Sequence, residues 1–430
     1  MPKPVIIDGL RTPFVKAGAH FDALGAHDLG RMVVSELLCR LDLSSKEIED
    51  VIYGNISQDS KTANPARVIA LNAGIPRHVP AHTVARNCAS GMEAIAEASD
   101  KIRLGESSIV MCGGTESMSN IPLIFPKKYA LFLSKLMRAK SLLQKIKVLS
   151  EFRLSFYRPR IALLEGLTDP FCGLSMGQTA EVLAREWQIS RDDQDQYALQ
   201  SHERTLKAQD DGKFLQEMMA VYVPPKYDVV VTEDIGPRRD QSFEKLQKLK
   251  PVFDRYYGTV TAGNSCQITD GAVSLVVMSE EKASVLGYSP LAKIKSYAFS
   301  GCDPKRMGLG PVFAAKKALD KAGLTVRDIG LWEINEAFAT QVMAVLKAFG
   351  SQKFAKEKLG LSNALGEIDP ETLNVNGGAI ALGHPVGASG ARIVLTLMKE
   401  MQRRNVQFGL ATLCVGGGQG GAMILERVGS

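Results

Sequence analysis

Two cysteines and one histidine are the residues of this sequence from which a nucleophilic site could be built. Cys88 lies in Asn87-Cys-Ala-Ser-Gly, after the short apolar run 82–85 and at the start of a predicted helix. The positive end of a helix dipole and its free N–H groups favour the thiolate, which is the nucleophilic form of cysteine. A cysteine at such a turn is also a common buried apolar filler, so this motif alone leaves both interpretations open.

His384 lies in the segment 376–390, which is rich in glycine and carries Pro385 directly after the histidine. Ordering a glycine-rich loop costs much backbone entropy, so an ordered loop of this kind indicates a structural or functional role. One interpretation is an imidazole held in place as a general base. The other is a histidine whose polar atoms are simply satisfied within a turn.

Cys414 ends the apolar run 408–414 and is followed by Val-Gly-Gly-Gly-Gln-Gly-Gly. Consecutive glycines leave backbone N–H groups open, which is what an oxyanion hole needs. The glycines at 416, 418 and 421 also match the spacing of a dinucleotide-binding fingerprint. A predicted strand, 422–426, follows them where that fingerprint requires a helix, so we exclude a nicotinamide site.

Asn335 is a fourth candidate, at the end of the predicted strand 331–334. A carboxamide at a strand end can hold a water molecule or a carbonyl group. The alternative is that Asn335 caps the N-terminus of the helix that follows.

These residues must be positioned by a framework of short buried strands that alternate with helices. Such strands, separated by helices, favour an α/β fold with a parallel sheet covered on both faces. We expect strands at 5–7, 51–53, 82–85, 109–111, 291–299, 331–334, 408–414 and 422–426, and helices at 29–40, 92–104, 312–322, 337–349 and 390–403.

The alternation of short strands and helices is found again after residue 291, which indicates two similar α/β halves. Ala-Ser-Gly opens a predicted helix in each half, at 89–91 and at 388–390. Between the halves lies a charged, proline-broken segment of helical pattern. We therefore expect an N-terminal half at 1–120 and 251–283, a loop domain at 121–250 and a C-terminal half at 284–430.

The composition is that of an ordinary globular protein: 430 residues, 45% hydrophobic and 23% charged. Seven scattered cysteines without a C-x-x-C pair argue against a zinc ribbon or a disulfide framework, and we expect no metal. We expect Cys39 and Cys112 to be core residues. No apolar run reaches the roughly 18 residues that a membrane span needs. Without a recognisable targeting segment, the expected location is a bacterial cytoplasm.

Residues 127–160 hold ten Lys or Arg and a single acid, Glu151. An apolar stripe at helical spacing runs through them, which predicts one basic amphipathic helix; its members are Phe132, Leu136, Ala139, Leu143 and Ile146. Such a helix can pack on its own domain, lie on an anionic membrane surface as a peripheral contact, or fill a partner's groove. No recognised nucleic-acid module surrounds it, so we expect no nucleic-acid partner.

Taken together and in this order, the motifs 87–91, 335–339, 383–385 and 414–421 resemble those of the thiolase family. The segments 258–264 and 307–311 are similar to two further thiolase motifs, so the resemblance covers nearly the whole chain. It implies that each half holds a five-stranded mixed sheet and that the two catalytic loops meet between the halves.

The resemblance also implies a role for each candidate. Cys88 would attack the keto carbon of a 3-ketoacyl-CoA, and His384 would take the thiol proton. Cys414 would protonate the departing acetyl-CoA enolate and then activate a second CoA. One oxyanion hole would use His384 and a water held by Asn335, and the other the N–H groups of Cys88 and Gly416.

By the same resemblance, Met176, Cys266 and Phe338 line the substrate and CoA site. Coenzyme A is then a co-substrate, and no cofactor is expected to be bound permanently. Family members commonly carry Ser or Thr where Cys266 stands, and a thiol is a weaker hydrogen-bond donor. Short-chain biosynthetic thiolases carry a histidine at the position of Ser175, so the degradative type is favoured here.

The expected function is thus thiolytic cleavage of 3-ketoacyl-CoA in fatty acid β-oxidation, with the biosynthetic acetoacetyl-CoA thiolase as the alternative. A non-catalytic scaffold would be expected to lose one of Cys88, His384 and Cys414, and all three are present. The resemblance implies a homodimer or tetramer. Because the basic insertion is similar to that of the thiolase subunit of the β-oxidation multienzyme complex, a hydratase/dehydrogenase α-subunit is a further expected partner.

Overall fold

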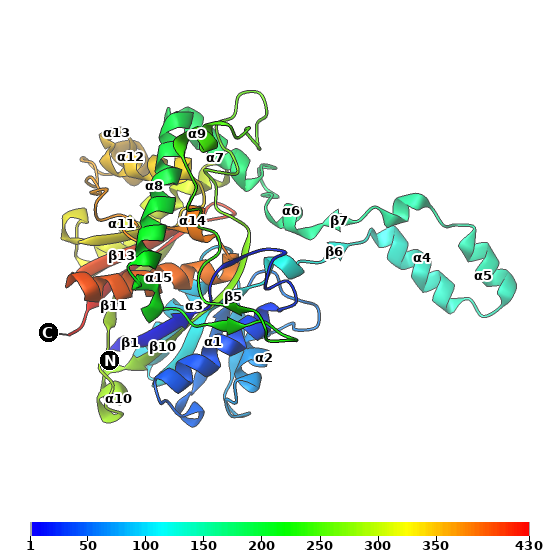
Figure 1. The fold of residues 1–430 in the computed structure, drawn as a ribbon, viewed down its shortest axis with the longest axis horizontal. Helices are drawn as coiled ribbons and strands as arrows, with labels where there is room; N and C mark the ends of the chain where they lie inside the picture. The colour runs from blue at the N-terminus through cyan, green and yellow to red at the C-terminus, as the bar shows by residue number, and fades with distance from the viewer. Residues whose placement is uncertain (1, 430) are drawn as a thin grey trace.

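The computed structural model describes residues 2–429, which form a layered α/β body and one projecting arm (Figure 1). Ten strands make the main sheet, and two-stranded ribbons form in the middle of the chain. The main strands are β1 (Pro4–Arg11), β2 (Val15–Lys16), β3 (Asp50–Gly54), β4 (Ala81–Val84), β5 (Ile109–Glu116), β10 (Thr269–Ser279), β11 (Ala292–Gly301), β12 (Leu331–Ile334), β13 (Phe408–Val415) and β14 (Gln419–Arg427).

The sheet is mixed, so the expectation of a parallel sheet is wrong. Its order is β12-β13-β14-β11-β1-β10-β5-β3-β4, with β2 beside β10, and within the described residues only β3–β4, β3–β5 and β12–β13 are parallel pairs. In the C-terminal half β14 runs antiparallel to both β13 and β11. In the N-terminal half the reason is β10, an eleven-residue buried strand that was not predicted. It lies between β1 and β5 and runs antiparallel to both.

The two halves meet at a narrow seam, where β1 and β11 share only two residue pairs, Val5 with Lys293 and Ile6 with Ala292. On the N-terminal side of the seam the strand order of the main sheet contains five strands, β1-β10-β5-β3-β4, as the family resemblance implied. On the C-terminal side it holds four among the described residues, from β11 to β12, rather than five. The predicted strands 331–334 and 408–414 correspond to β12 and β13.

Helices cover both faces of the sheet and fill the space between the halves. The main helices are α1 (Ala26–Arg40), α2 (Pro65–Asn72), α3 (Ser90–Leu104), α11 (Gly310–Ala322), α12 (Ala339–Gly350) and α15 (Val386–Arg404). The others are α4 (Lys127–Arg138), α5 (Leu142–Leu149), α6 (Ala162–Gly166), α7 (Met176–Glu186), α8 (Arg191–Asp210), α9 (Phe243–Gln247), α10 (Glu280–Val285), α13 (Gln352–Phe354) and α14 (Ala379–Leu382). The helix predicted at 390–403 begins four residues earlier, at Val386.

Strand alternation explains the layers, because successive side chains point to opposite faces of a sheet. On β1, Ile6 faces a core built with α3 and α15, whereas Val5 and Ile7 face α1 and α2. On β13, Leu413 faces the same α3/α15 core, and Leu410 faces α11 and α12. The fold therefore has five layers, in the order α1/α2, the N-terminal strands, α3/α15, the C-terminal strands and α11/α12.

The helices α3 and α15 approach each other at glycines of the repeated Ala-Ser-Gly motif. A Cβ atom on Gly91 would lie 2.8 Å from the backbone nitrogen of Ala391, and one on Gly390 would lie 2.6 Å from that of Met92. Real Cβ atoms do not come so close to backbone, so each position accepts only glycine without a shift of a helix. The motif thus marks the crossing of the two central helices.

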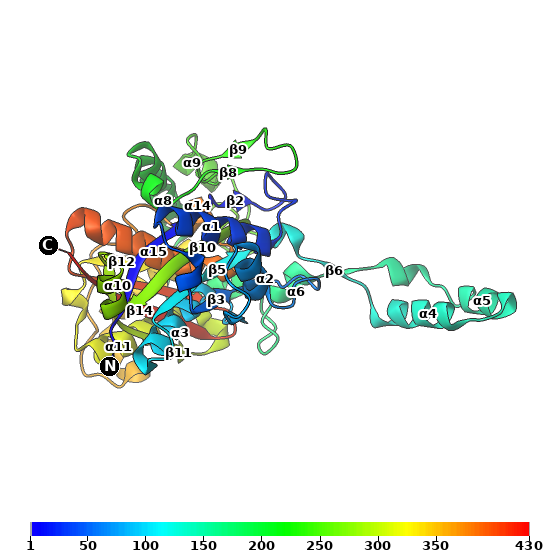
Figure 2. The same ribbon diagram turned by 90° about the horizontal axis from the view of Figure 1, so that it is seen from below.

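The predicted basic amphipathic helix is in fact two helices, α4 and α5, so the single continuous stripe is wrong. The chain leaves the helical conformation at Ala139, and Ser141 caps α5 together with Gln144. This capping box is a strong signal for the start of a new helix, so the chain does not continue α4 along the apolar stripe. Of the three alternatives for this segment, packing on its own domain does not fit the structure, since α4 and α5 project far from the body (Figures 1 and 2).

The arm, residues 123–161, leaves and rejoins the body through the ribbon of β6 (Leu123–Ile124) and β7 (Arg160–Ile161). An aromatic cluster holds it together, with ring centroids 5.4–6.3 Å apart: Phe125, Tyr129, Phe132, Phe152, Phe156 and Tyr157. An ion pair of 2.7 Å joins Lys135 to Glu151. No helix of the described chain combines the length and the apolar character needed to cross a bilayer.

Substitution of Gly91 by Ala should lower the free energy of unfolding by about 1–3 kcal/mol, the usual cost of overpacking a core. The added methyl group would meet the backbone of α15, which cannot rotate away as a side chain could. Gly166→Ala is the matched control, because nothing lies within 4 Å of its added Cβ. Urea unfolding followed by circular dichroism measures both; equal stability of the two variants would contradict the crossing.

Candidate active site

Three segments carry the two predicted cysteines and the predicted histidine: the loop from β4 to α3, the loop before α15, and the end of β13 with the turn to β14. Asn87 holds a positive φ of 43° and donates from Nδ2 to the carbonyl oxygen of Gly416 at 2.7 Å. Ser90 accepts from the Arg86 N–H at 2.8 Å and donates to the Asn87 carbonyl at 2.7 Å. The loop of Cys88 is therefore closed on itself and joined to the turn at 416–418.

The Cys88 thiol is partly buried and lies two residues before α3. Burial raises its pKa, and the N–H groups of Gly416 and of Cys88 itself, which donate toward the sulfur, offset only part of that rise. Burial therefore outweighs the expected stabilisation of a thiolate by the helix N-terminus. Cys88 is a neutral thiol that needs a base, and two N–H groups already surround it.

His384 is buried between α14 and α15, and its backbone N–H donates to the Gln267 carbonyl at 3.0 Å. Its Nδ1 lies 2.5 Å from Ser389 Oγ, and that hydroxyl donates to the Pro385 carbonyl at 3.0 Å. A serine hydroxyl has one proton to give; with that proton directed to the Pro385 carbonyl, Nδ1 carries the hydrogen and donates to Oγ. Nε2 is then the unprotonated nitrogen.

The electrostatics fit this tautomer. His384 Nε2 is buried and has no hydrogen-bond partner in the described structure. Burial, and secondly the charge of Arg392, lower the pKa of His384 to about 4. At neutral pH the imidazole is therefore an uncharged base with its free nitrogen available for a proton.

Asn335 follows β12, and its backbone N–H donates to the Thr412 carbonyl at 3.0 Å. Its side chain is fully buried, and neither Nδ2 nor Oδ1 finds a partner within residues 2–429. The alternative that Asn335 caps the next helix is wrong, since α12 begins at Ala339 with Phe338 in the capping position. A buried carboxamide with both ends open is suited to hold a water molecule or a ligand oxygen.

Cys414 lies at the end of β13 and is 1% exposed. Burial raises its pKa well above the ordinary thiol value, and the neighbouring thiols of Cys88, Cys266 and Cys302 act in the same direction. The structure thus gathers four of the seven cysteines around one site. The sequence reasoning gave Cys302 no place in it.

The residues expected to line the substrate and CoA site also gather around Cys414. Phe338 shares an apolar cluster with Cys414, and Met176 packs against that cluster. The Met176 sulfur would lie 3.2 Å from a Cβ on Gly416. The backbone N–H of Cys266 donates to the Ala337 carbonyl at 3.0 Å, and burial raises the pKa of its thiol to about 12.

Sequence reasoning missed three residues at or around this site: Ser389, Glu116 and Phe253, whose ring packs against the apolar cluster of Phe338 and Cys414. Glu116 ends β5, and its carboxylate accepts the N–H groups of Ile56, Ser57 and Gly387 at 2.9–3.1 Å, which fixes the start of α15 to the N-terminal half. Burial raises the pKa of Glu116 to about 7. The available signals were the serine five residues after His384 and an acid directly after Gly-Gly-Thr at a strand end.

Cys112 is buried on β5, as expected, whereas Cys39 is exposed on α1, so its assignment to the core is wrong. Cys39 follows the buried pair Leu37 and Leu38 and points to the outer side of the helix. The part of the chain that the structure describes contains no group of three or more His, Cys, Asp or Glu residues that could hold a metal ion.

Comparison with known proteins agrees with this geometry. The model of the thiolase N-terminal domain matches residues 4–281, and that of the thiolase C-terminal domain matches residues 288–427. The 3-ketoacyl-CoA thiolases of Yersinia pestis (strain Pestoides F) and of Yersinia pseudotuberculosis (strain YPIII) are each 43% identical over 423 residues. These alignments cover 98% of this chain and 96% of each relative.

Solved structures share the whole fold. The acetyl-CoA acetyltransferase of Bacillus anthracis superposes with a TM-score of 0.87 at 38% identity, and human mitochondrial 3-ketoacyl-CoA thiolase with 0.86 at 36%. Each match covers 100% of this chain and 99% of the other. The human enzyme was also solved in complex with CoA, with a TM-score of 0.85 at 36% identity and 98% of that chain covered. The chain therefore belongs to the thiolase family.

Proposed function

We propose that this chain is a 3-ketoacyl-CoA thiolase that uses coenzyme A to cleave 3-ketoacyl-CoA into acetyl-CoA and a shortened acyl-CoA. The observation that carries the proposal is that burial keeps both the Cys88 thiol and the His384 imidazole neutral, and that His384 Nε2 is buried without a hydrogen-bond partner among the described residues. A thiol with a raised pKa reacts only when a base removes its proton.

The reaction begins as Cys88 Sγ attacks the keto carbon while His384 Nε2 takes the thiol proton. The carbon–carbon bond then breaks, the electron pair leaves on the acetyl-CoA enolate, and Cys414 protonates that carbon. The acyl group remains on Cys88 as a thioester. Cys414 then accepts the proton of a second CoA thiol, whose sulfur attacks the thioester. The shortened acyl-CoA leaves, and the released Cys88 sulfur takes back the proton held by His384.

Each tetrahedral intermediate carries an oxyanion, and the site offers two sets of donors. The N–H groups of Cys88 and Gly416 already point at the Cys88 sulfur and can serve one oxyanion. The open carboxamide of Asn335 can hold the water that, with His384, serves the other. In the same proposal Met176, Cys266 and Phe338 contact the acyl-CoA.

Biosynthetic condensation of short chains remains the less favoured alternative. The fold does not separate the two types, since an acetyl-CoA acetyltransferase superposes as well as a 3-ketoacyl-CoA thiolase does. Ser175 favours the degradative type. Its hydroxyl accepts the Gln178 N–H at 3.3 Å, so position 175 caps α7 and offers no imidazole to a substrate.

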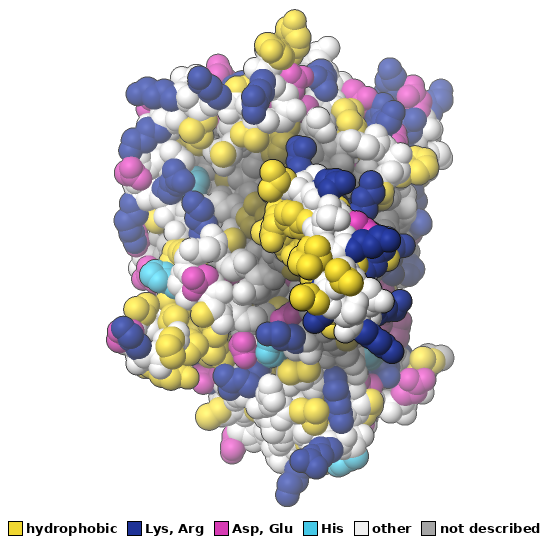
Figure 3. Space-filling view, turned by 90° about the vertical axis from the view of Figure 1, so that its right-hand side faces the viewer, with side chains coloured by type: hydrophobic (Ala, Val, Ile, Leu, Met, Phe, Trp, Pro, Cys, Tyr) yellow, Lys and Arg dark blue, Asp and Glu magenta, His cyan; other side chains and the backbone are white. Residues whose placement is uncertain are grey.

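We also infer that the protein acts as at least a homodimer and that its arm lies on the anionic inner face of a bacterial membrane, where a hydratase/dehydrogenase α-subunit would join it. Viewed from its tip, the arm shows apolar side chains on one flank and Lys and Arg on the other (Figure 3). Leu143 and Ile146 are 80% and 55% exposed. Exposed apolar side chains flanked by basic ones are suited to an anionic bilayer surface.

Cys88→Ala should abolish thiolysis, because no other described group takes the place of the thiol that forms the thioester. Cys414→Ala should lower both half-reactions by several orders of magnitude, since proton transfer typically contributes about 10²–10⁴-fold. The assay follows loss of 3-ketoacyl-CoA of C4, C10 and C16 with CoA. Cys39→Ala, at an exposed thiol, is the control and should behave as the unsubstituted chain. Normal turnover by Cys88→Ala would refute the assignment.

Ser389→Ala should lower kcat by about 3- to 10-fold with little change in KM, because the hydrogen bond that selects the Nδ1–H tautomer is worth about 1 kcal/mol. Ser389→Thr should restore part of kcat. Ser99→Ala is a matched control, since its hydroxyl is buried on α3 without a partner. In the unsubstituted chain kcat/KM should rise with pH through about 4, as His384 loses its proton. An acid limb at pH 6.5 would contradict a neutral buried imidazole.

The double variant Leu143→Glu/Ile146→Glu should lose vesicle binding by about 10-fold or more, since each buried leucine or isoleucine contributes about 1.5–3 kcal/mol. Vesicles of phosphatidylglycerol and phosphatidylcholine are sedimented with the protein, beside vesicles of phosphatidylcholine alone. The control Leu104→Glu/Val285→Glu changes two exposed residues of the body. Sedimentation of the arm variant at the unsubstituted level would assign the arm to a protein partner instead.

A further inference from the structure

A buried ion pair joins α15 to β12 inside the core. Nη1 of Arg392 donates to Oε2 of Glu333 at 3.1 Å, and the two side chains are 1% and 4% exposed. Arg392 Nε is buried and has no hydrogen-bond partner within residues 2–429. Replacing a buried ion pair by apolar residues is often neutral or stabilising. The stability of the fold therefore does not by itself explain a guanidinium with an open N–H group at this place.

The Glu333 end of the pair lies on the same side of β12 as Asn335. Leu331 of this strand packs in the α3/α15 core, whereas Ile334 packs in the α11/α12 core. Because side chains alternate along a strand, Glu333 faces α15 as Leu331 does. The N–H of Asn335 donates to the Thr412 carbonyl and so continues the pairing of β12 with β13. Asn335 therefore follows Glu333 on the side that faces α15.

The Arg392 end of the pair lies close to His384. Ser389, whose Oγ is 2.5 Å from His384 Nδ1, precedes Arg392 by three residues and so shares its face of α15. Side chains of a helix lean toward its N-terminus, which directs the guanidinium toward this serine. The charge of Arg392 lowers the pKa of His384, as expected for a cation near the imidazole. One ion pair thus connects the surroundings of His384 with those of Asn335.

Arg392 brings a positive charge to a site whose other titratable groups are acids. These are the thiols of Cys88, Cys266 and Cys414 and the carboxyl groups of Glu116 and Glu336, which accept the N–H groups of Gly387 and Ile380. Glu333 does not cancel this charge, because burial raises its pKa to about 8 against the effect of Arg392; the nearby Glu336, Glu217 and Glu400 add to that rise. A guanidinium stays protonated, so its field persists at neutral pH.

We propose that Arg392 is a positioning residue of the oxyanion hole that His384 forms with the water held by Asn335. Through Glu333 it fixes Asn335 relative to α15, and from behind His384 its charge stabilises the oxyanion that binds at Nε2. A preorganised charge acts strongly in a site from which bulk water is excluded. The inference rests on the proposed thiolase function and adds to it a residue that acts through His384 and Asn335.

Arg392→Gln tests this, because it removes the charge and keeps a polar side chain. We expect kcat to fall about 10-fold with little change in KM, which is less than the roughly 10²–10³-fold cost of losing a direct oxyanion donor. The acid limb of kcat/KM should move to higher pH, since no nearby cation then opposes the imidazolium. Arg392→Lys retains the charge, so it should keep the limb near pH 4 and recover most of kcat.

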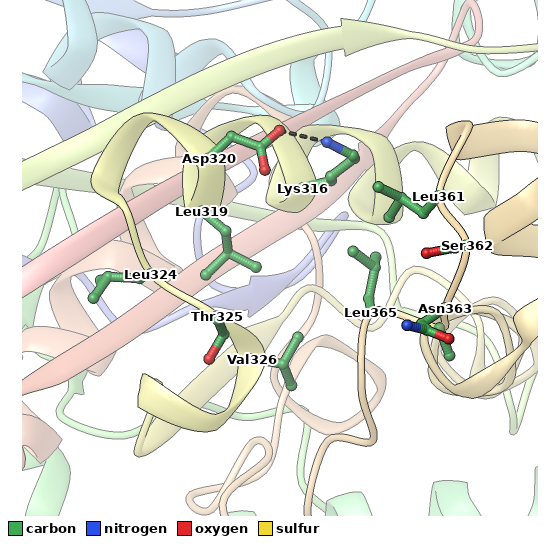
Figure 4. Close-up of a pocket in the computed structure, with 11 residues that line it drawn as sticks. Lys316, Leu319, Asp320, Leu324, Thr325, Val326, Leu361, Ser362, Asn363 and Leu365 are labelled. Carbon is green, nitrogen blue, oxygen red and sulfur yellow. Dashed lines mark hydrogen bonds and ion pairs between the residues drawn. The ribbon is translucent and has the colours of Figure 1, made fainter.

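Two controls make the same kind of substitution elsewhere. Arg404→Gln removes an ion pair of 2.6 Å with Glu400 at the other end of α15. Lys316→Gln removes the ion pair of 2.5 Å with Asp320 on α11, beside a surface cavity of about 270 Å³ (Figure 4). Both variants should leave the acid limb where it is in the unsubstituted chain. Thiolysis of C4 3-ketoacyl-CoA is measured at each pH, and every sample is assayed again at neutral pH to show that it has not unfolded.

An acid limb of Arg392→Gln at the unsubstituted position would overturn the inference, as would an equal shift in Arg404→Gln. If Arg392→Gln does not fold, Arg392→Lys decides, because a limb at higher pH despite the retained charge would overturn it too. An unsubstituted chain that cleaves no 3-ketoacyl-CoA would instead refute the thiolase function. The two failures are therefore distinguishable.

Discussion

The close crossing of α3 and α15 is the constraint on which the active site depends. Each helix begins beside a residue of the proposed mechanism, Cys88 before α3 and His384 before α15. Because Gly91 and Gly390 let the two backbones touch, the two helix starts are held in one place by packing rather than by flexible side chains. Glu116 adds a polar tie, since it binds the Gly387 N–H at the start of α15 from the other half of the molecule.

Burial sets the chemistry of the site in a consistent direction. It raises the pKa of the Cys88 and Cys414 thiols and lowers that of His384, so all three groups are uncharged at neutral pH. Desolvation always disfavours the charged form. Proton transfer from a thiol of raised pKa to an imidazole of lowered pKa is then uphill, so it has to accompany the attack of the sulfur on the substrate.

Local sequence patterns predicted most of the framework, and the failures have physical causes. A strand such as β12 is recognised from its short apolar run, and a helix such as α1 from its apolar periodicity, without knowledge of the rest of the fold. The strand β10 was missed although it is apolar, and its antiparallel position between β1 and β5 depends on pairing partners more than 150 residues away. At the arm, the capping box of Ser141 and Gln144 ended a helix that the apolar stripe alone would have continued.

The same distinction holds for the site. Cys88, His384 and Cys414 stand in unusual local sequences and were found as candidates by residue type and by family resemblance. The protonation of Cys88 could not be predicted, because it depends on burial by segments distant in sequence. Ser389 defines the tautomer of His384 only through a hydrogen bond that exists once α15 has formed.

The position of β10 sets the order in which this protein can be completed during synthesis. β1 and β5 are made first, and both pair with β10, which follows β5 by about 150 residues. At about 5–20 residues per second, the ribosome needs about 8–30 s to make that stretch. Throughout this time the edges of β1 and β5 are without their common partner, a period in which the nascent chain is exposed to wrong strand pairing.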